Sequence, residues 1–310
     1  MSTTTEPILA RLDVSIAPAR LARSAVLADY WALTKPEVNF LIVLTTFAGF
    51  SLARAAVWQD FPFWLSINTL LGTLLVASGT GTLNQFLERN FDAHMRRTAR
   101  RPLASGRLPP TAVLWFGIAL SVVGIAYLSV TVNALASLLT MATLLSYLFL
   151  YTPLKRKTPL CTLVGAFPGA MPPLIGWAAA SGRLNLHALT LYAILFLWQF
   201  PHFMAIAWMY REDYARAGYL VLPANHDVRA RVVTLQTVLP LLALVPLSLL
   251  PLLMGEAKFY WIGALLLGAG FLYYAAEFVR RGSNSAARHL LAASIIYIPA
   301  LFVVMLLARN

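Results

Sequence analysis

Nine apolar stretches divide this chain, and they limit its possible folds more than any other feature of the sequence. Each is long enough, or nearly so, to cross the roughly 30 Å hydrocarbon core of a bilayer. They lie at about 37–53, 63–87, 111–130, 134–151, 160–180, 187–208, 233–254, 259–279 and 289–308. The sequence therefore predicts an all-α membrane protein, with about nine transmembrane helices in a bundle around an intramembrane cavity that opens to the cytoplasmic side.

Composition supports the same fold class. Hydrophobic residues make up 59% of the chain and charged residues only 12%, whereas soluble domains have about 45–50% and about 25%. The single Cys161 excludes a disulfide framework and a cysteine-based zinc site. Residues 1–35 contain no apolar core, so we expect a cytoplasmic N-terminal arm that is not a cleavable signal, followed by a single membrane domain over residues 36–310.

The basic residues are distributed very unevenly between the apolar stretches. Of the 24 Lys and Arg, 20 fall in the N-terminal arm and in the loops 88–110, 152–159, 209–232 and 280–288. The other four are Arg54, Arg183, Lys258 and Arg309. Because cytoplasmic loops carry the excess of Lys and Arg, we expect a cytoplasmic N-terminus and an external C-terminus. The lipid bilayer also accounts for the net charge of +12, so no nucleic-acid partner is expected.

A stripe of polar residues at the end of the second stretch is the main candidate for chemistry. Asn84, Glu88 and Asp92 are spaced i, i+4, i+8, which places them on one face of a helix. Such a stripe suits a divalent metal that carries a phosphorylated ligand, because Mg²⁺ is usually held by one or two carboxylates together with substrate phosphates. The alternative is a charged helix end at the membrane surface, with its acids paired to Arg89 and Arg96.

Basic side chains follow the stripe in two loops and are candidates for binding a diphosphate, because guanidinium groups bind phosphates bidentately. They are Arg96, Arg97, Arg100 and Arg101 in the first loop, and Lys155 and Arg156 in the second. Contact of the arginines with anionic lipid head groups is an equally physical alternative. The cations of the second loop are also explained as topology determinants alone.

The sixth stretch carries His202 directly after Pro201. An ionisable residue inside a span indicates function by default, because burying it without a partner is costly. The alternative is a hydrogen bond to the carbonyl that the proline leaves free. Glu212 and Asp213 follow this stretch and point to different faces of a helix, so at most one of them joins a shared metal site unless the helix has ended. The fifth stretch is rich in Gly and Pro and should bend or break.

Aromatic residues accompany His202. Trp198, Tyr210 and Tyr214 are typical of an interfacial aromatic belt. They also suit the wall of a cavity in which a carbocation forms, because aromatic faces attract cations.

Taken together, these residues resemble the intramembrane prenyltransferases of the UbiA superfamily over roughly residues 30–305. The matching blocks are Asn84-Gln-Phe-Leu-Glu88-Arg-Asn-Phe-Asp92 with Arg100-Arg101-Pro102-Leu103, Tyr151-Thr-Pro-Leu-Lys-Arg, Gly169-Ala-Met-Pro-Pro-Leu-Ile-Gly-Trp177, and Trp198-Gln-Phe-Pro-His-Phe with Tyr210-Arg-Glu-Asp-Tyr-Ala-Arg-Ala-Gly218. Glu88 stands where the superfamily motif prefers Asp. Tyrosines flank Glu212-Asp213 where members that prenylate quinone precursors carry a denser run of Asp, which favours the branch of the family that modifies haem.

The resemblance implies a reaction and its cofactors. Farnesyl diphosphate would donate its farnesyl group to the vinyl group of haem B, a substrate and no permanent cofactor, and water addition would give haem O. The metal would be Mg²⁺, with Mn²⁺ as a possibility, held by Asn84, Glu88, Asp92 and Asp213. The setting would be the bacterial inner membrane, and haem A synthase or the assembly of a terminal oxidase would supply protein partners.

The resemblance also implies roles for the remaining candidates. Glu212 and Asp213 would join the stripe as catalytic residues. The basic side chains of the two loops would contact substrate, together with Tyr151, Trp198, His202, Tyr210 and Tyr214. A prenyltransferase acting on a quinone precursor is the nearest alternative. A transporter is more distant, because the acids gather at one end of the spans rather than near the membrane midplane, where transport sites tend to lie.

Overall fold

The computed structural model describes residues 23–54, 61–253 and 259–308, and every regular element within them is helical. Nine helical segments in these ranges are long and apolar enough to cross a membrane. They are α2 (Pro36–Arg54), α3 (Phe63–Asp92), α4 (Pro110–Thr131), α5 to α6 (Ala134–Leu154), α7 to α8 (Cys161–Ser181), α9 (Leu186–Met209), α11 (His226–Leu247), α13 (Tyr260–Arg281) and α14 (Asn284–Ala308). The predicted multi-pass helical membrane protein is confirmed.

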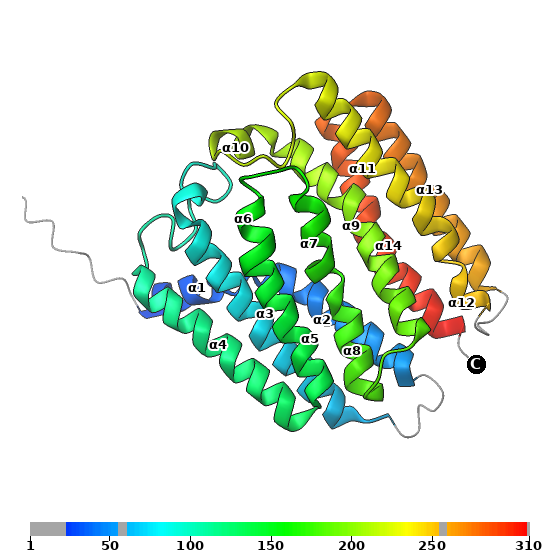
Figure 1. The fold of residues 1–310 in the computed structure, drawn as a ribbon, viewed down its shortest axis with the longest axis horizontal. Helices are drawn as coiled ribbons and strands as arrows, with labels where there is room; N and C mark the ends of the chain where they lie inside the picture. Colours follow the sequence, from blue (N-terminus) through cyan, green and yellow to red (C-terminus); the bar gives the residue numbers. More distant parts are fainter. Residues whose placement is uncertain (1–22, 55–60, 254–258, 309–310) are drawn as a thin grey trace, which may run out of the picture.

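Three short helices complete the described chain: α1 (Arg23–Leu33), α10 (Arg211–Arg216) and α12 (Leu250–Leu253). The spans pack side by side in one bundle, in which α3 lies against α4, and α2 against α8 (Figure 1). Helix α9 is central to the other half of the bundle, because it contacts α7 and α8 on one side and α11 and α14 on the other.

Glycines allow the closest approach between two spans. A Cβ atom on Gly176 of α8 would collide with the Thr46 carbonyl oxygen of α2, and one on Gly49 of α2 would collide with the Pro173 carbonyl oxygen of α8. Small residues of this kind let helix backbones meet inside a membrane, where van der Waals packing has to replace the hydrophobic effect between helices.

The predicted break in the fifth span is confirmed. The segment is divided into α7 (Cys161–Gly169) and α8 (Met171–Ser181), with Pro168 inside the first and Pro172 and Pro173 at the start of the second. The fourth span contains a feature that the sequence did not predict, since α5 (Ala134–Leu145) continues into a π-helical segment, η2 (Ser146–Tyr151), before the short α6 (Thr152–Leu154).

Helix ends differ from the predicted ranges at two places that matter for the site. Helix α3 does not end near residue 87 but continues to Asp92, so the whole polar stripe is helical. The seventh span begins at His226 rather than near 233, because the Asn225 side chain accepts hydrogen bonds from the amides of Asp227 and Val228 and thereby caps the helix there.

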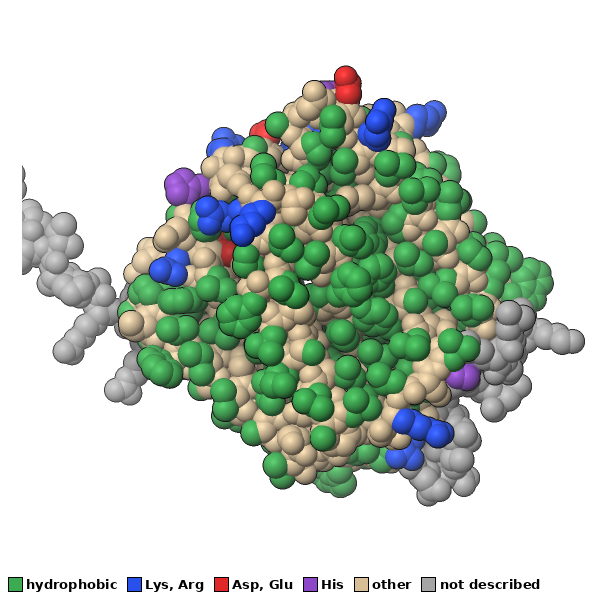
Figure 2. Space-filling model, viewed as in Figure 1, with side chains coloured by type: hydrophobic (Ala, Val, Ile, Leu, Met, Phe, Trp, Pro, Cys, Tyr) green, Lys and Arg blue, Asp and Glu red, His purple; other side chains and the backbone are tan. Residues whose placement is uncertain are grey.

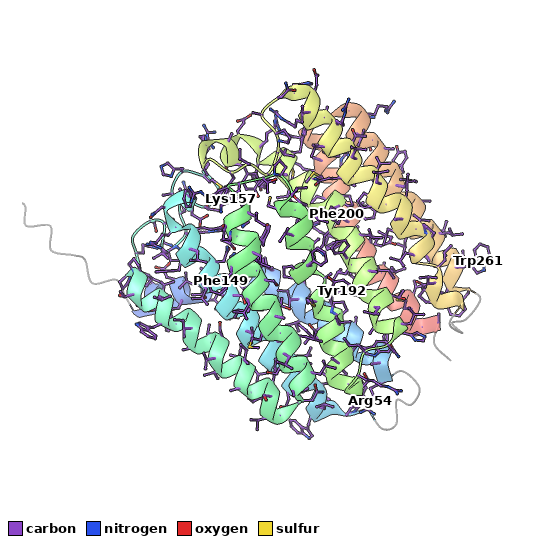
Figure 3. The ribbon with its side chains drawn as sticks, viewed as in Figure 1. Arg54, Phe149, Lys157, Tyr192, Phe200 and Trp261 are labelled. Atoms are coloured by element: carbon purple, nitrogen blue, oxygen red, sulfur yellow. The ribbon has the colours of Figure 1, made fainter. Side chains whose placement is uncertain are left out.

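The described basic loops lie together at one end of the bundle. Figure 2 shows Lys and Arg side chains gathered around that end, and Figure 3 places Lys157 there, with Arg54 at the opposite end. Contacts between loops agree with this grouping, since the Leu220 amide donates to the Lys155 carbonyl at 2.8 Å and Arg211 Nη1 donates to Asn284 Oδ1 at 2.9 Å. Four of the counted cations, Arg11, Arg20, Lys258 and Arg309, lie outside the described residues.

Candidate functional site

The polar stripe of α3 is buried at the basic end of the bundle. Asn84, Glu88 and Asp92 are only 1%, 6% and 1% exposed, and their spacing places them on one face of a continuous helix, as predicted. Burying two carboxylates is costly unless partners compensate for the lost hydration. The surroundings of the stripe therefore decide what it can bind.

Each member of the stripe contacts a cation from a different segment of the chain. Lys155 Nζ lies 2.8 Å from Glu88 Oε1, and Arg101 Nη1 lies 2.7 Å from Asp92 Oδ2. Lys35 Nζ donates to Asn84 Oδ1 at 2.8 Å. The alternative of a helix end whose acids pair with Arg89 and Arg96 is not what the structure contains, because Arg89 donates to the Phe86 carbonyl and Arg96 is exposed.

Lys35 is a site residue that the sequence analysis missed. It lies between α1 and α2 with φ at 54°, and it is the one non-glycine residue with positive φ in the described part of the chain. Such a conformation costs roughly 1–2 kcal/mol, and strain of this kind tends to gather at functional sites. Burial and the nearby Arg101 lower the pKa of Lys35 from 10.5 to about 7. The available signal was a lysine directly before Pro36, at the start of a span.

Lys155 reaches the stripe from the end of the fourth span. Burial opposes its charge, but the Glu88 carboxylate outweighs that effect and raises the pKa of Lys155 well above 10.5. Its ammonium group also lies 4.5 Å from the centre of the Tyr151 ring, a cation–π contact. The π-helical segment η2 brings Tyr147 and Tyr151 into contact, with 5.1 Å between ring centres. Isolated π-helical turns of this kind are frequent at functional sites.

Tyr219 is a second residue that the sequence analysis missed. Its side chain is 5% exposed, and its buried hydroxyl lies near the Glu88 carboxylate. Burial, with the Glu88 carboxylate close by, raises the pKa of Tyr219 above its usual value of 10. The ring packs against Phe91 of the stripe helix and against Tyr214. No motif marks Tyr219, because it lies one residue beyond the last matching block.

The donor set of the stripe fits a magnesium ion that shares its ligands with a substrate. Asp92 Oδ1 is buried and has no hydrogen-bond partner within the described residues, so an acceptor is free at the C-terminal end of the stripe. No three His, Cys, Asp or Glu side chains of the described chain are grouped as a metal cage. Two carboxylates and an amide are incomplete as an all-protein site, and Mg²⁺ typically completes such a set with phosphate oxygens and water.

The two acids after the sixth span have different surroundings. Asp213 is 8% exposed, forms an ion pair with Arg216, and accepts a hydrogen bond from the Arg97 amide at 3.3 Å. It therefore joins α10 to the loop that follows the stripe. The side chain of Glu212 is 79% exposed and contacts only the Arg211 guanidinium, at 4.0 Å. The structure thus places Asp213 next to the loop of the site and Glu212 outside it.

The candidate arginines also fall into two groups, one in contact with the stripe and one exposed. Arg101 is the one member of the first-loop set that is turned toward the stripe, whereas Arg96, Arg97 and Arg100 are exposed. Arg97 lies over the Tyr210 ring at 4.9 Å. Arg156 is exposed as well and lies over Phe91 at 4.1 Å. The side chains that contact the stripe in the described chain are thus Lys35, Lys155 and Arg101, and not these exposed cations.

His202 has a partner on α14 and not the carbonyl that Pro201 leaves free. Its Nδ1 lies 2.8 Å from Ser294 Oγ, and that hydroxyl donates its own proton to the Leu291 carbonyl at 2.6 Å. Ser294 Oγ must therefore accept from Nδ1–H, which leaves Nε2 as the ring nitrogen with the lone pair. Trp198 stacks on the imidazole at 4.8 Å and donates to the Ser294 carbonyl. A fixed tautomer of this kind is typical of a histidine that presents its other nitrogen to a metal or a donor.

Comparison with known proteins identifies the family. The UbiA prenyltransferase family matches residues 35–304. A protoheme IX farnesyltransferase of Solibacter usitatus is 48% identical over 288 residues, covering 91% of this chain and 98% of that protein. The protoheme IX farnesyltransferase of Koribacter versatilis is 39% identical over 319 residues, covering both chains completely.

Solved structures share the fold. A digeranylgeranylglyceryl phosphate synthase superposes with a TM-score of 0.73 at 18% identity, covering 91% of this chain and 98% of the other. A UbiA homologue of Archaeoglobus fulgidus bound to GPP and Mg²⁺ has a TM-score of 0.63 at 15% identity, covering 89% of this chain and 99% of the other. Nine apolar spans, the match over residues 35–304 and these relatives lead to one conclusion: the chain belongs to the UbiA prenyltransferase family.

Proposed function

We propose that this chain transfers the farnesyl group of farnesyl diphosphate to a vinyl group of protoheme IX, with addition of water, to give haem O. The structural observation that carries the proposal is the buried stripe of Asn84, Glu88 and Asp92 beside three cations at one end of an apolar bundle. That arrangement suits a ligand with a polyanionic head and a hydrocarbon tail. The relatives of high identity and coverage support haem as the acceptor.

The residues of the stripe and the neighbouring cations have separate roles toward the diphosphate. Mg²⁺, when held by Asn84, Glu88 and Asp92, supplies positive charge that stabilises the leaving group. Lys35, Lys155 and Arg101 are within reach of the same residues and are placed to neutralise further diphosphate charge. Preorganised charge at a site shielded from water accelerates ionisation, because it meets the negative charge as that charge develops.

The proposed transfer passes through two cations, one on the farnesyl group and one on the haem. The bond between the first farnesyl carbon and the diphosphate oxygen breaks, and the electron pair leaves with diphosphate. The vinyl carbon of the haem then forms a bond to the allylic cation, and water adds to the resulting cation on the haem side and loses a proton. Aromatic faces beside the stripe, including Tyr147 and Tyr151, suit the stabilisation of such cations. Exclusion of bulk water by the apolar bundle protects the first cation from hydrolysis.

His202 is our candidate for contact with the haem. Its Nε2 carries the lone pair, because Ser294 and Leu291 fix the tautomer, and neutral imidazole is a common iron ligand. Asp213 is the candidate fourth oxygen ligand, since it is buried beside the loop that follows the stripe. Prenylation of a quinone precursor remains the alternative within the family.

A paired assay separates the two acceptors. Purified protein receives labelled farnesyl diphosphate and Mg²⁺, with haem B in one reaction and 4-hydroxybenzoate in the other, and the products are analysed by mass spectrometry. We expect label in a haem product whose mass exceeds that of haem B by a farnesyl group and a hydroxyl group. Label in the benzoate and none in haem would refute the proposal. Replacing Mg²⁺ by Mn²⁺ in the first reaction tests the choice of metal.

A further inference from the structure

A second basic site lies away from the stripe, where α9, α11 and α13 reach the end of the bundle that carries the basic loops (Figure 1). A pocket of about 320 Å³ opens between them. Trp208 of α9, Arg229 of α11 and Arg280 of α13 contribute to its wall. None of the stripe residues or of their cation partners lines it, so it is separate from the proposed diphosphate site.

The described residues that line the pocket include several cations and no acid. Arg229, Arg280 and Arg281 lie in its wall together with His226. The side chain of Arg229 is held in place, because its Nε donates to the Pro223 carbonyl at 2.9 Å and its Nη2 donates to the Ala224 carbonyl. Both acceptors are neutral, so the positive charge of Arg229 is not compensated by them. Arg280 is exposed and forms no ion pair within the described chain, and Arg281 shares its charge with Glu277 at 3.1 Å.

Apolar side chains also contribute to the wall of the pocket. Val233 and Phe278 are buried there, and Trp208 packs edge-to-face on Phe278 with 5.8 Å between ring centres. The indole is fixed from its other side by Arg211, whose guanidinium lies 5.2 Å from the ring centre. A small soluble anion gains no binding energy from these apolar residues. A molecule with a charged head and a hydrocarbon chain can contact both the basic and the apolar residues of the lining.

The position of the pocket agrees with that of a lipid head group. Helix α11 begins at His226 and α13 ends at Arg281, so the arginines lie at the level where these two spans leave the hydrocarbon. Basic pockets between transmembrane helices at this level bind phosphate-containing head groups. Arginine is suited to the task, because its planar fork matches phosphate oxygens bidentately.

We propose that this pocket binds the phosphate of an anionic phospholipid, with the guanidinium groups of Arg229, Arg280 and Arg281 around the head group and the first part of an acyl chain along Trp208, Val233 and Phe278. The site is independent of the proposed farnesyl transfer, because it shares no residue with the stripe. It differs from general attraction of lipids to a basic protein, since it requires particular arginines around a cavity.

The experiment compares three variants of the full chain in nanodiscs. Arg280→Gln removes one lining charge, and Arg231→Gln is the matched control, because Arg231 is an exposed arginine of α11 that does not line the pocket. Ala230→Phe fills the pocket and leaves every charge in place. Native mass spectrometry counts the phosphatidylglycerol or phosphatidylcholine molecules that the released protein retains, over a series of lipid ratios.

We expect wild type and Arg231→Gln to retain one phosphatidylglycerol in preference to phosphatidylcholine. Arg280→Gln should need about fivefold more phosphatidylglycerol for the same occupancy, in line with the electrostatic contribution of one arginine near a membrane surface. Ala230→Phe should lose the preference for phosphatidylglycerol, because its ring occupies the cavity. Equal loss in Arg280→Gln and Arg231→Gln would overturn the proposal, because it would show attraction by net charge alone. Displacement of the lipid by millimolar inorganic phosphate would overturn the assignment to a lipid and indicate a site for soluble anions. Ala230→Phe keeps the test decisive if Arg280→Gln does not fold.

Discussion

Lys155 and Glu88 form a buried ion pair, with 2.8 Å between Nζ and Oε1, although 67 residues separate them in the sequence. The pair joins the end of the fourth span to the stripe on α3. A buried ion pair is a poor source of stability, because the cost of desolvation offsets much of the attraction. Its position beside Asn84 and Asp92 is better explained by the ligand that we propose for the stripe.

The acids of the stripe should be required for turnover. Glu88→Gln and Asp92→Asn each remove a charge that the metal needs, and we expect haem O formation to fall by more than about 100-fold, as when one preorganised electrostatic group is lost. Asp227→Asn is the matched control, because the side chain of Asp227 is 99% exposed, and it should keep wild-type activity. Near-normal turnover of both stripe variants at saturating Mg²⁺ would show that the chemistry occurs elsewhere.

Folding has to be measured in the same experiment. Glu88→Gln leaves Lys155 as an unpaired buried cation, and breaking a buried pair in this way costs about 3–5 kcal/mol. We therefore expect a lower folded yield by size-exclusion chromatography for Glu88→Gln, and recovery of that yield in Glu88→Gln/Lys155→Met, which removes both charges. Turnover should stay lost in the double variant.

Tyr219 should support metal binding through Glu88. Its buried hydroxyl lies near that carboxylate, and hydrogen bonds to a ligating carboxylate typically affect metal affinity by about 10–100-fold. We expect Tyr219→Phe to weaken Mn²⁺ binding by this factor in electron paramagnetic resonance titrations, with excess Mg²⁺ restoring turnover. Tyr297→Phe removes the hydroxyl of another buried tyrosine, whose ring packs on Phe271 of α13, and should leave Mn²⁺ affinity unchanged. Equal affinities in both variants would assign Tyr219 to packing alone.

His202 should influence the haem and not the diphosphate. If its Nε2 approaches the iron, the Soret band of haem bound to the purified protein should shift in His202→Ala, and by less in Ser294→Ala, where the imidazole loses the partner of Nδ1. Binding of farnesyl diphosphate should persist in both variants. His187→Ala is the control from the opposite end of α9, where that imidazole stacks on Trp177. A Soret band that does not move in His202→Ala, together with normal haem O formation, would remove His202 from the haem site.

The contact between α2 and α8 should be sensitive to a single methyl group. A Cβ on Gly176 meets the Thr46 carbonyl, and inserting an atom into such packing costs roughly 1–3 kcal/mol. We expect Gly176→Ala to lower the midpoint of thermal unfolding in detergent. Gly270→Ala on α13 is matched to it, because nothing lies within 4 Å of the added atom, and its midpoint should not fall. A similar decrease in both variants would contradict the special role of the Gly176 contact, because an effect of Gly→Ala on the unfolded chain alone raises the midpoint.

The membrane orientation is tested by fusion. The 20-to-4 distribution of Lys and Arg predicts a cytoplasmic N-terminus and an external C-terminus. A fluorescent reporter that folds only in the cytoplasm should be dark when it follows Asn310 and bright when it precedes Met1. Fluorescence from the C-terminal fusion would mean that the number of spans is even.

Much of the architecture was predictable from the sequence. Nine apolar stretches predicted nine spans, because length and hydropathy alone decide what crosses a bilayer, and the described helices confirm them. The glycines and prolines of the fifth span predicted that it bends or breaks, and the structure divides it at Ala170. The i, i+4, i+8 spacing placed Asn84, Glu88 and Asp92 on one face, because the helical period is a local property.

The partners of that stripe were decided only by the tertiary structure. Lys35, Lys155 and Tyr219 reach it from three segments distant in sequence, and no local pattern records which loop ends meet in space. Whether Asp213 or Glu212 lies next to the site depended on where α10 packs against the loop after α3. The side chain of His202 likewise contacts Ser294 on α14 rather than a backbone carbonyl of its own helix. Periodicity specifies the face of a helix, whereas the packing of the whole bundle determines what that face contacts.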